Sequence, residues 1–176
     1  MSGGWAPSWG LRRRCRAALA GLELPLVGVD IQTVRRCLEA ERGRQIELTP
    51  VAGSRLTHGL WASTDDVEFV QYERHTTVWH QWLIVCHEFA HMMLGHDADA
   101  ALSTEDRAVL MPDLPGVDVN FVLRREVYDS HQEQEAEYLA TLLMQRIDRV
   151  AALPGVTARA DAAAVARLMQ SLGDVG

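Results

Sequence analysis

The chain has 176 residues, of which 48% are hydrophobic and 23% are charged. This length lets one domain bury a core without disulfide bonds, and the composition argues against both a disordered chain and a membrane protein. The 24 acidic residues outnumber the 17 basic ones, all arginine, and the resulting net charge of -7 repels nucleic acid over most of the surface.

The cysteines of the chain are few and widely spaced: Cys15, Cys37 and Cys86. An odd number at such spacing fits neither a secreted disulfide framework nor a cysteine zinc site. A basic run near the N-terminus resembles an export leader, but Glu23 and Pro25 cut its apolar part short. We therefore expect reduced thiols and a cytoplasmic protein.

The first 44 residues predict a loose arm followed by two helices. Residues 1–10 hold Gly, Pro, Ser and Trp without periodicity and are expected to form the arm. The first helix is expected over residues 11–24, and the second is expected to begin after the cap residue Asp30 and to end at Gly43. This segment holds eight arginines against four acidic residues. We interpret the helix pair as scaffold, with contact to a partner or nucleic acid as the alternative.

After the second helix, the pattern changes to short alternating or β-branched runs. These runs are residues 45–51, 60–63 and 67–72. Glycines and an Asp-Asp pair separate them, as turns separate strands. The segment predicts a small antiparallel sheet, so that helices and strands together predict an α+β fold.

A third helix is expected to begin after a cap at Thr76 or Thr77 and to continue to Leu94. Gly95 can end it, and no helix breaker lies between. The second half of this helix carries the strongest functional pattern of the chain.

The C-terminal part of the chain predicts loops and then two helices. Residues 96–129 are interrupted by Pro and Gly and are expected to form loops over the site. A long helix is expected over residues 130–150 and a last one over residues 157–172. Residues 11–176 are thus predicted to form a single domain with its core at about 45–150.

The third helix contains His87, Glu88 and His91 in the pattern HExxH. Residues four apart lie on one face of a helix, so both imidazoles can bring a nitrogen to about 2 Å from one zinc ion. Glu88 lies one position round the helix, where it can hold a metal-bound water and act as general base. The pattern predicts zinc-dependent hydrolysis of a peptide bond.

The alternative is that the two histidines are core residues with ordinary partners, beside a surface glutamate. The motif, however, lies within an apolar helix, from Leu83 to Cys86 before it and from Met92 to Leu94 after it. Polar groups buried there need partners, and a metal ion supplies one. The surroundings favour the catalytic interpretation.

A catalytic zinc needs a third protein ligand, and Glu133 is the first candidate. On a helical wheel it falls on the packed face of the long helix, whereas Glu135 is expected to point away from the core. Ser130 and Glu133 also have the spacing of a capping box, which would occupy Glu133 with a backbone amide. Glu135 and His131 are the remaining alternatives.

Two stretches of the chain resemble the ImmA/IrrE family of bacterial zinc metallopeptidases, of the gluzincin type. They are CHEFAHMMLGH at residues 86–96 and EQEAEYLATLLM at residues 133–144. The resemblance implies a compact zincin-like fold. In such a fold a small sheet packs on the HExxH helix, and a second long helix carries the third ligand.

By matching residues, the resemblance also implies that His87, His91 and Glu133 bind Zn²⁺ and that Glu88 is the base. Family members are linked to cleavage of helix-turn-helix repressors. A protein substrate of this class is therefore expected, with no direct binding of nucleic acid or membrane.

Other polar residues keep two interpretations each. His80, His96, His131 and Tyr128 could stabilise an oxyanion or serve the fold alone. Glu137 could orient a ligand imidazole or lie solvated on the surface. The alternative to an enzyme is a zinc-stabilised protein that binds a regulator without cutting it. Glu88 separates the two functions, because binding alone needs no general base.

Overall fold

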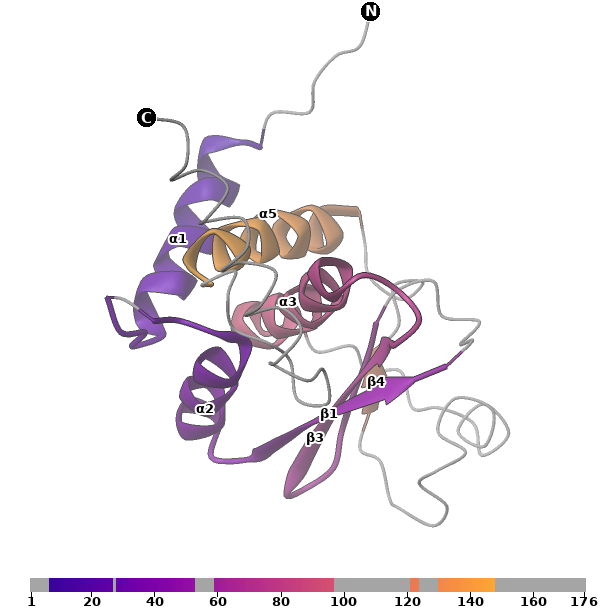
Figure 1. Ribbon diagram of the computed structural model, residues 1–176. Helices are drawn as coiled ribbons and strands as arrows, with labels where there is room; N and C mark the ends of the chain where they lie inside the picture. The colour runs from indigo at the N-terminus through magenta and orange to yellow at the C-terminus, as the bar shows by residue number, and fades with distance from the viewer. Residues whose placement is uncertain (1–6, 27, 53–58, 97–120, 124–129, 148–176) are drawn as a thin grey trace, which may run out of the picture.

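Four helices and four strands make up the described part of the chain (Figure 1). The computed structural model describes residues 7–26, 28–52, 59–96, 121–123 and 130–147. The helices are α1 (Trp9–Gly21), α2 (Ile31–Arg42), α3 (Val78–Leu94) and α5 (Ser130–Arg146). The strands are β1 (Gln45–Val51), β2 (Leu60–Ser63), β3 (Val67–Glu73) and β4 (Phe121–Leu123). The predicted α+β class is confirmed.

Local capping explains where the two N-terminal helices begin and end. The Ser8 hydroxyl accepts a hydrogen bond from the backbone N–H of Leu11, so α1 begins at Trp9, and residues 9–10 belong to this helix rather than to the predicted loose arm. The Asp30 carboxylate accepts from the N–H of Thr33 at 2.6 Å and caps α2 as predicted. Gly43 ends α2 in the left-handed conformation, with φ of 66°.

The sheet has the strand order β1-β3-β2-β4 and is mixed, which corrects the predicted antiparallel sheet. β2 and β3 form an antiparallel hairpin, closed where the N–H of Thr64 donates to the carbonyl of Val67 at 2.8 Å. β1 pairs with the other edge of β3 and runs parallel to it. Alternation along a strand shows which residues share a face, but it carries no information on the direction of the neighbouring strand.

β4 lies in a region predicted to be loop. It pairs antiparallel with β2, with Trp61 opposite Leu123 and Ser63 opposite Phe121. Three residues are too few for an alternation to be visible in the sequence, and the pairing depends on a strand far away in the chain. The rest of the predicted loop after His96, Tyr128 included, and the predicted last helix at residues 157–172 lie outside the described residues.

α3 lies between the sheet and α5, while α1 packs against α5 and α3 (Figure 1). Buried side chains of α2, the sheet, α3 and α5 form the main core cluster, among them Leu38, Trp61, Phe89 and Leu143. The buried side chains of α1 join a second cluster with α3 and α5. The sheet thus packs on the helix that carries the HExxH motif, with a second long helix beside it. Eleven of the 17 residues of α3 are buried. Polar groups on this helix are therefore held in place by packing on several sides.

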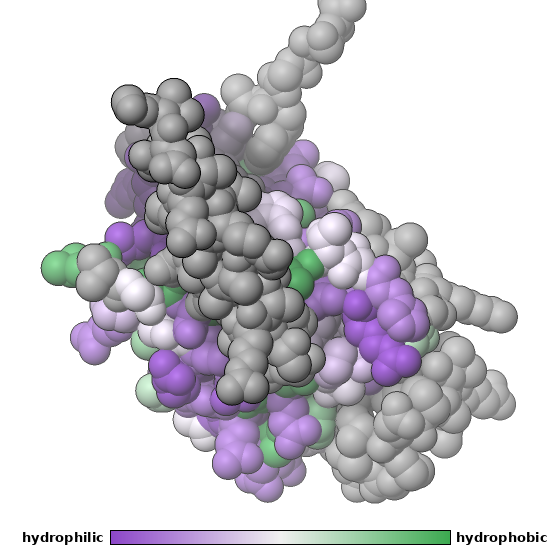
Figure 2. Space-filling model, in the orientation of Figure 1, coloured by the Kyte–Doolittle hydropathy of each residue, from purple (hydrophilic) through white to green (hydrophobic). Residues whose placement is uncertain are grey.

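Among the coloured residues in Figure 2, hydrophilic side chains predominate and apolar ones lie between them. None of the helices in the described ranges is long and apolar enough to cross a membrane.

Candidate metal centre

Two imidazoles of α3 converge on one point. His87 and His91 lie one helical turn apart, and their Nε2 atoms face each other at 3.1 Å. The His91 side chain is fully buried, whereas that of His87 is 15% exposed. The pair is thus open to solvent on the His87 side only.

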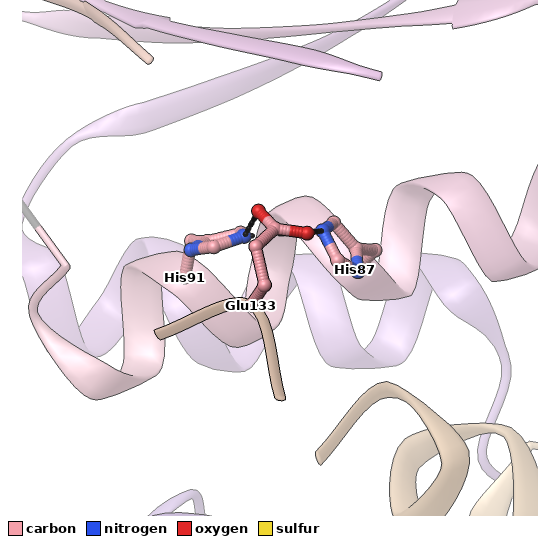
Figure 3. Close-up of side chains that lie close together, drawn as sticks. All are labelled: His87, His91 and Glu133. Atoms are coloured by element: carbon pink, nitrogen blue, oxygen red, sulfur yellow. Dashed lines mark hydrogen bonds and ion pairs between the residues drawn. The ribbon is translucent and has the colours of Figure 1, made fainter. Parts of the chain in front are cut away.

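Glu133 approaches the same point from α5. Its Oε1 lies 3.5 Å from Nε2 of His91, and its Oε2 lies 3.7 Å from Nε2 of His87 (Figure 3). Figure 3 shows the carboxylate between the two rings, which is the orientation predicted for a third ligand rather than for a capping box. The packing of α5 on α3 brings the three residues together although 42 positions separate Glu133 from His91 in the sequence.

The three residues fit a zinc ion in both spacing and donor type. Two atoms bound tetrahedrally at about 2.0–2.1 Å from zinc lie roughly 3.3 Å apart. The observed separations of 3.1, 3.5 and 3.7 Å lie close to that value, and all the ligand atoms lie within 4.8 Å of one another. Two imidazoles and one carboxylate would leave the fourth position of a tetrahedral metal ion open.

The protonation states at neutral pH also suit a metal. Burial lowers the pKa of His91 to about 4, and the neighbouring rings of His87 and His96 act in the same direction against Glu133. Burial alone would raise the pKa of Glu133, but the two adjacent imidazoles hold that pKa well below its usual range. At pH 7 the site therefore offers a neutral His91 and an ionised carboxylate, the forms that bind metal.

Glu88 lies buried beside its two histidine neighbours, with 4% of its surface exposed. Gly59, the residue before β2, lies directly against its carboxyl group. A Cβ at position 59 would stand 2.8 Å from Cγ and 2.9 Å from Cδ of Glu88, closer than such atoms approach in proteins. In the sequence, Gly59 is one of the glycines that separate the predicted strands, and no residue near it points to Glu88.

Glu135 is buried, with 1% exposed, which corrects the prediction that it points away from the core. The helical-wheel argument assumed a single packed face on the long helix. α5 is instead covered on two sides, by α3 and by α1, so Glu133 faces the histidines while Glu135 faces Arg14 of α1. His96 also contacts Glu135, with Nε2 3.1 Å from Oε2.

The other polar residues for which the sequence left two interpretations differ in their exposure. His80 and His131 are exposed, and His96 is buried at 2%. Glu137 is exposed and lines a pocket next to His87. Tyr128 lies outside the described residues.

The pocket beside His87 has a volume of about 360 Å³. Its apolar wall comes from Leu83, Ile84 and Ala140, and its polar rim includes Glu137. Gly59, which contacts Glu88, borders it as well, so the pocket lies between this glycine and the exposed side of the histidine pair. A pocket of this size can hold the side chain of a ligand.

No protein-family model, curated protein or solved structure matches the chain.

Proposed function

We propose that this protein is a zinc-dependent endopeptidase of narrow specificity. The observation that carries the proposal is the convergence of His87, His91 and Glu133 at separations suited to one zinc ion. Glu88, buried on the same helix between the two histidines, supports catalysis rather than metal storage. The same proposal includes a zincin-like fold, in which the sheet, the HExxH helix and the helix that carries the third ligand follow one another along the chain.

Each residue has a defined task in the reaction. His87, His91 and Glu133 hold the metal, which when bound polarises the peptide carbonyl and lowers the pKa of water. The Glu88 carboxylate takes the proton of the attacking water and then delivers it to the amine that leaves. Because Gly59 has no side chain, the carboxyl group of Glu88 can lie directly against the backbone at position 59, and this contact holds it in place.

The pocket beside His87 suggests how a substrate is selected. Leu83, Ile84 and Ala140 favour an apolar substrate side chain next to the cleaved bond. The resemblance of residues 86–96 and 133–144 to ImmA/IrrE metallopeptidases supports a regulatory protein as substrate, and a helix-turn-helix repressor in particular. We further propose that the protein acts in the cytoplasm, in keeping with free cysteines at all three positions.

The test compares the wild type with Glu88→Gln. Both proteins are loaded with zinc, incubated with candidate repressors and analysed by mass spectrometry for fragments. The variant keeps the side-chain shape but lacks the proton acceptor, so we expect equal zinc content and a loss of cleavage of roughly a hundredfold to ten-thousandfold. Equal cleavage by both proteins would exclude Glu88 as the base. If neither protein cuts a repressor that both bind tightly, the zinc-stabilised binding protein is the better function.

A further inference from the structure

A series of polar contacts leads away from the metal centre through the buried residues His91, His96 and Glu135. It begins at Nδ1 of His91, which lies 3.0 Å from Nδ1 of His96. It continues from Nε2 of His96 to Oε2 of Glu135 at 3.1 Å. It ends at Arg14 of α1, whose Nη1 lies 3.2 Å from the same carboxylate oxygen.

We propose that His96, Glu135 and Arg14 position His91 for metal binding. The inference rests on the proposed function in so far as His91 must be a ligand. None of the three residues touches the metal or the substrate in this proposal. Their task is to fix which nitrogen of His91 carries its proton and where the ring points.

The geometry allows only one distribution of protons if His91 binds a metal. Its Nε2 faces His87 and Glu133, so this nitrogen must be free of a proton to act as ligand. The His91 proton then lies on Nδ1 and is donated to Nδ1 of His96. His96 consequently carries its own proton on Nε2, which donates to the Glu135 carboxylate. Every contact in the chain is satisfied by this one assignment.

Because His91, His96 and Glu135 are buried, each of them needs its partner in this series of contacts. His91, His96 and Glu135 are 0%, 2% and 1% exposed, so water cannot replace a lost partner easily. Arg14 supplies the charge that balances the buried carboxylate, and its Nη2 also donates to the carbonyl of Leu94 at 3.2 Å. His131 approaches the same carboxylate at 3.8 Å from the exposed side.

A helix-ending turn places His96 against His91. Gly95 ends α3 with φ of 63°, and the N–H of His96 donates to the carbonyl of His91 at 3.1 Å. The N–H of Gly95 donates to the carbonyl of Met92 at 3.3 Å, which completes a Schellman motif. The backbone therefore folds back on the last turn of α3, and the side chain of His96 lies against that of His91.

The test measures the zinc dissociation constant by competition with a chromogenic chelator. His96→Phe keeps a ring but removes the acceptor for His91, and we expect zinc to bind roughly tenfold to a hundredfold more weakly. In His96→Asn the side-chain carbonyl can again accept from Nδ1 of His91, so this variant should recover part of the loss. His131→Phe is the matched control, because His131 lies near the same carboxylate but outside the chain, and it should bind zinc as the wild type does.

A second comparison tests the outer end of the chain. Arg14→Gln should weaken zinc binding in the otherwise unchanged protein and should have no further effect when Glu135→Gln is already present, because Arg14 acts through that carboxylate. The Arg14 side chain is 53% exposed, so this arm does not depend on replacing a core residue. Visible spectra of the cobalt-substituted proteins report the ligand geometry independently of activity.

The outcomes separate the two proposals. Unchanged zinc affinity in His96→Phe, or equal affinity of the Phe and Asn variants, overturns the positioning role while leaving the endopeptidase proposal intact. If His96→Phe does not fold, additive effects of Arg14→Gln and Glu135→Gln on zinc affinity overturn it instead. A wild type that binds no zinc overturns both proposals.

Discussion

Gly59 and Glu88 are in direct contact, and the absence of a side chain at position 59 is what lets the strand β2 begin beside the predicted base. The contact joins two segments whose relation is invisible in the sequence. Any side chain at position 59 would collide with the carboxyl group of Glu88.

Gly59→Ala should therefore impair cleavage without removing the metal. The added Cβ would stand 2.8 Å from Cγ of Glu88 and must displace that side chain. We expect the cleavage rate to fall by roughly tenfold or more, because a small misplacement of a catalytic group is costly. Zinc content, measured by metal analysis, should equal that of the wild type. Full activity in the Ala variant would contradict the role given to Glu88.

Zinc stoichiometry should depend on all three converging residues. We expect one zinc per chain in the wild type and a loss of tight binding in His87→Ala, His91→Ala and Glu133→Ala, since two remaining ligands hold the ion poorly. Glu137→Ala is the control, because Glu137 is an exposed glutamate one helical turn beyond Glu133. A full zinc complement in Glu133→Ala would remove this residue from the ligand set.

The metal-free protein should lose stability as the pH falls from about 6.5 to about 4. Burial lowers the pKa of His91 to about 4, whereas its ordinary value is 6.5. Between these values the unfolded chain binds the proton and the folded chain does not, so acid favours unfolding. The loss attributable to His91 is about 3 kcal/mol at most. Denaturant titrations at pH 7 and pH 4.5 give the free energy of unfolding at each pH. The difference between these two free energies should be smaller in His91→Gln than in the wild type.

The three cysteines should differ in reactivity. Burial, reinforced by the charge of Glu135, raises the pKa of the Cys15 thiol to about 11, and burial raises that of Cys86 as well. Cys37 is only partly buried. Iodoacetamide at pH 8 should therefore modify Cys37 in the folded protein, and Cys15 and Cys86 only after denaturation. Peptide mass spectrometry shows the order, and early alkylation of Cys86 would contradict the packing of α3.

Local chemistry made much of the fold predictable from the sequence. Asp30 and Thr77 cap the helices they were expected to cap, and Gly43 and Gly95 end them. Strands β1 and β2 have the predicted bounds. The bounds of these elements depend on residues only a few positions apart, and the HExxH motif can likewise be recognised from five consecutive residues.

Apart from the start of α1, which the local cap Ser8 sets, the features that could not be predicted depend on contacts between distant segments. The parallel pairing of β1 with β3 and the short strand β4 are set by which edges meet in the folded chain. The burial of Glu135 depends on α1, which lies more than 100 positions earlier in the sequence. A helical wheel describes one helix and cannot show that a second helix covers its other side.

The contact between Arg14 and Glu135 spans 121 positions and has a consequence for the order of events during synthesis. The ribosome releases α1 first and α5 much later, so α1 waits for its partner while the intervening sheet and α3 emerge. His87, His91 and His96 have by then emerged, but Glu133 and Glu135 arrive only with α5. A nascent chain that ends before α5 lacks Glu133, one of the three proposed ligands, so we expect high-affinity metal loading to begin only when α5 leaves the exit tunnel.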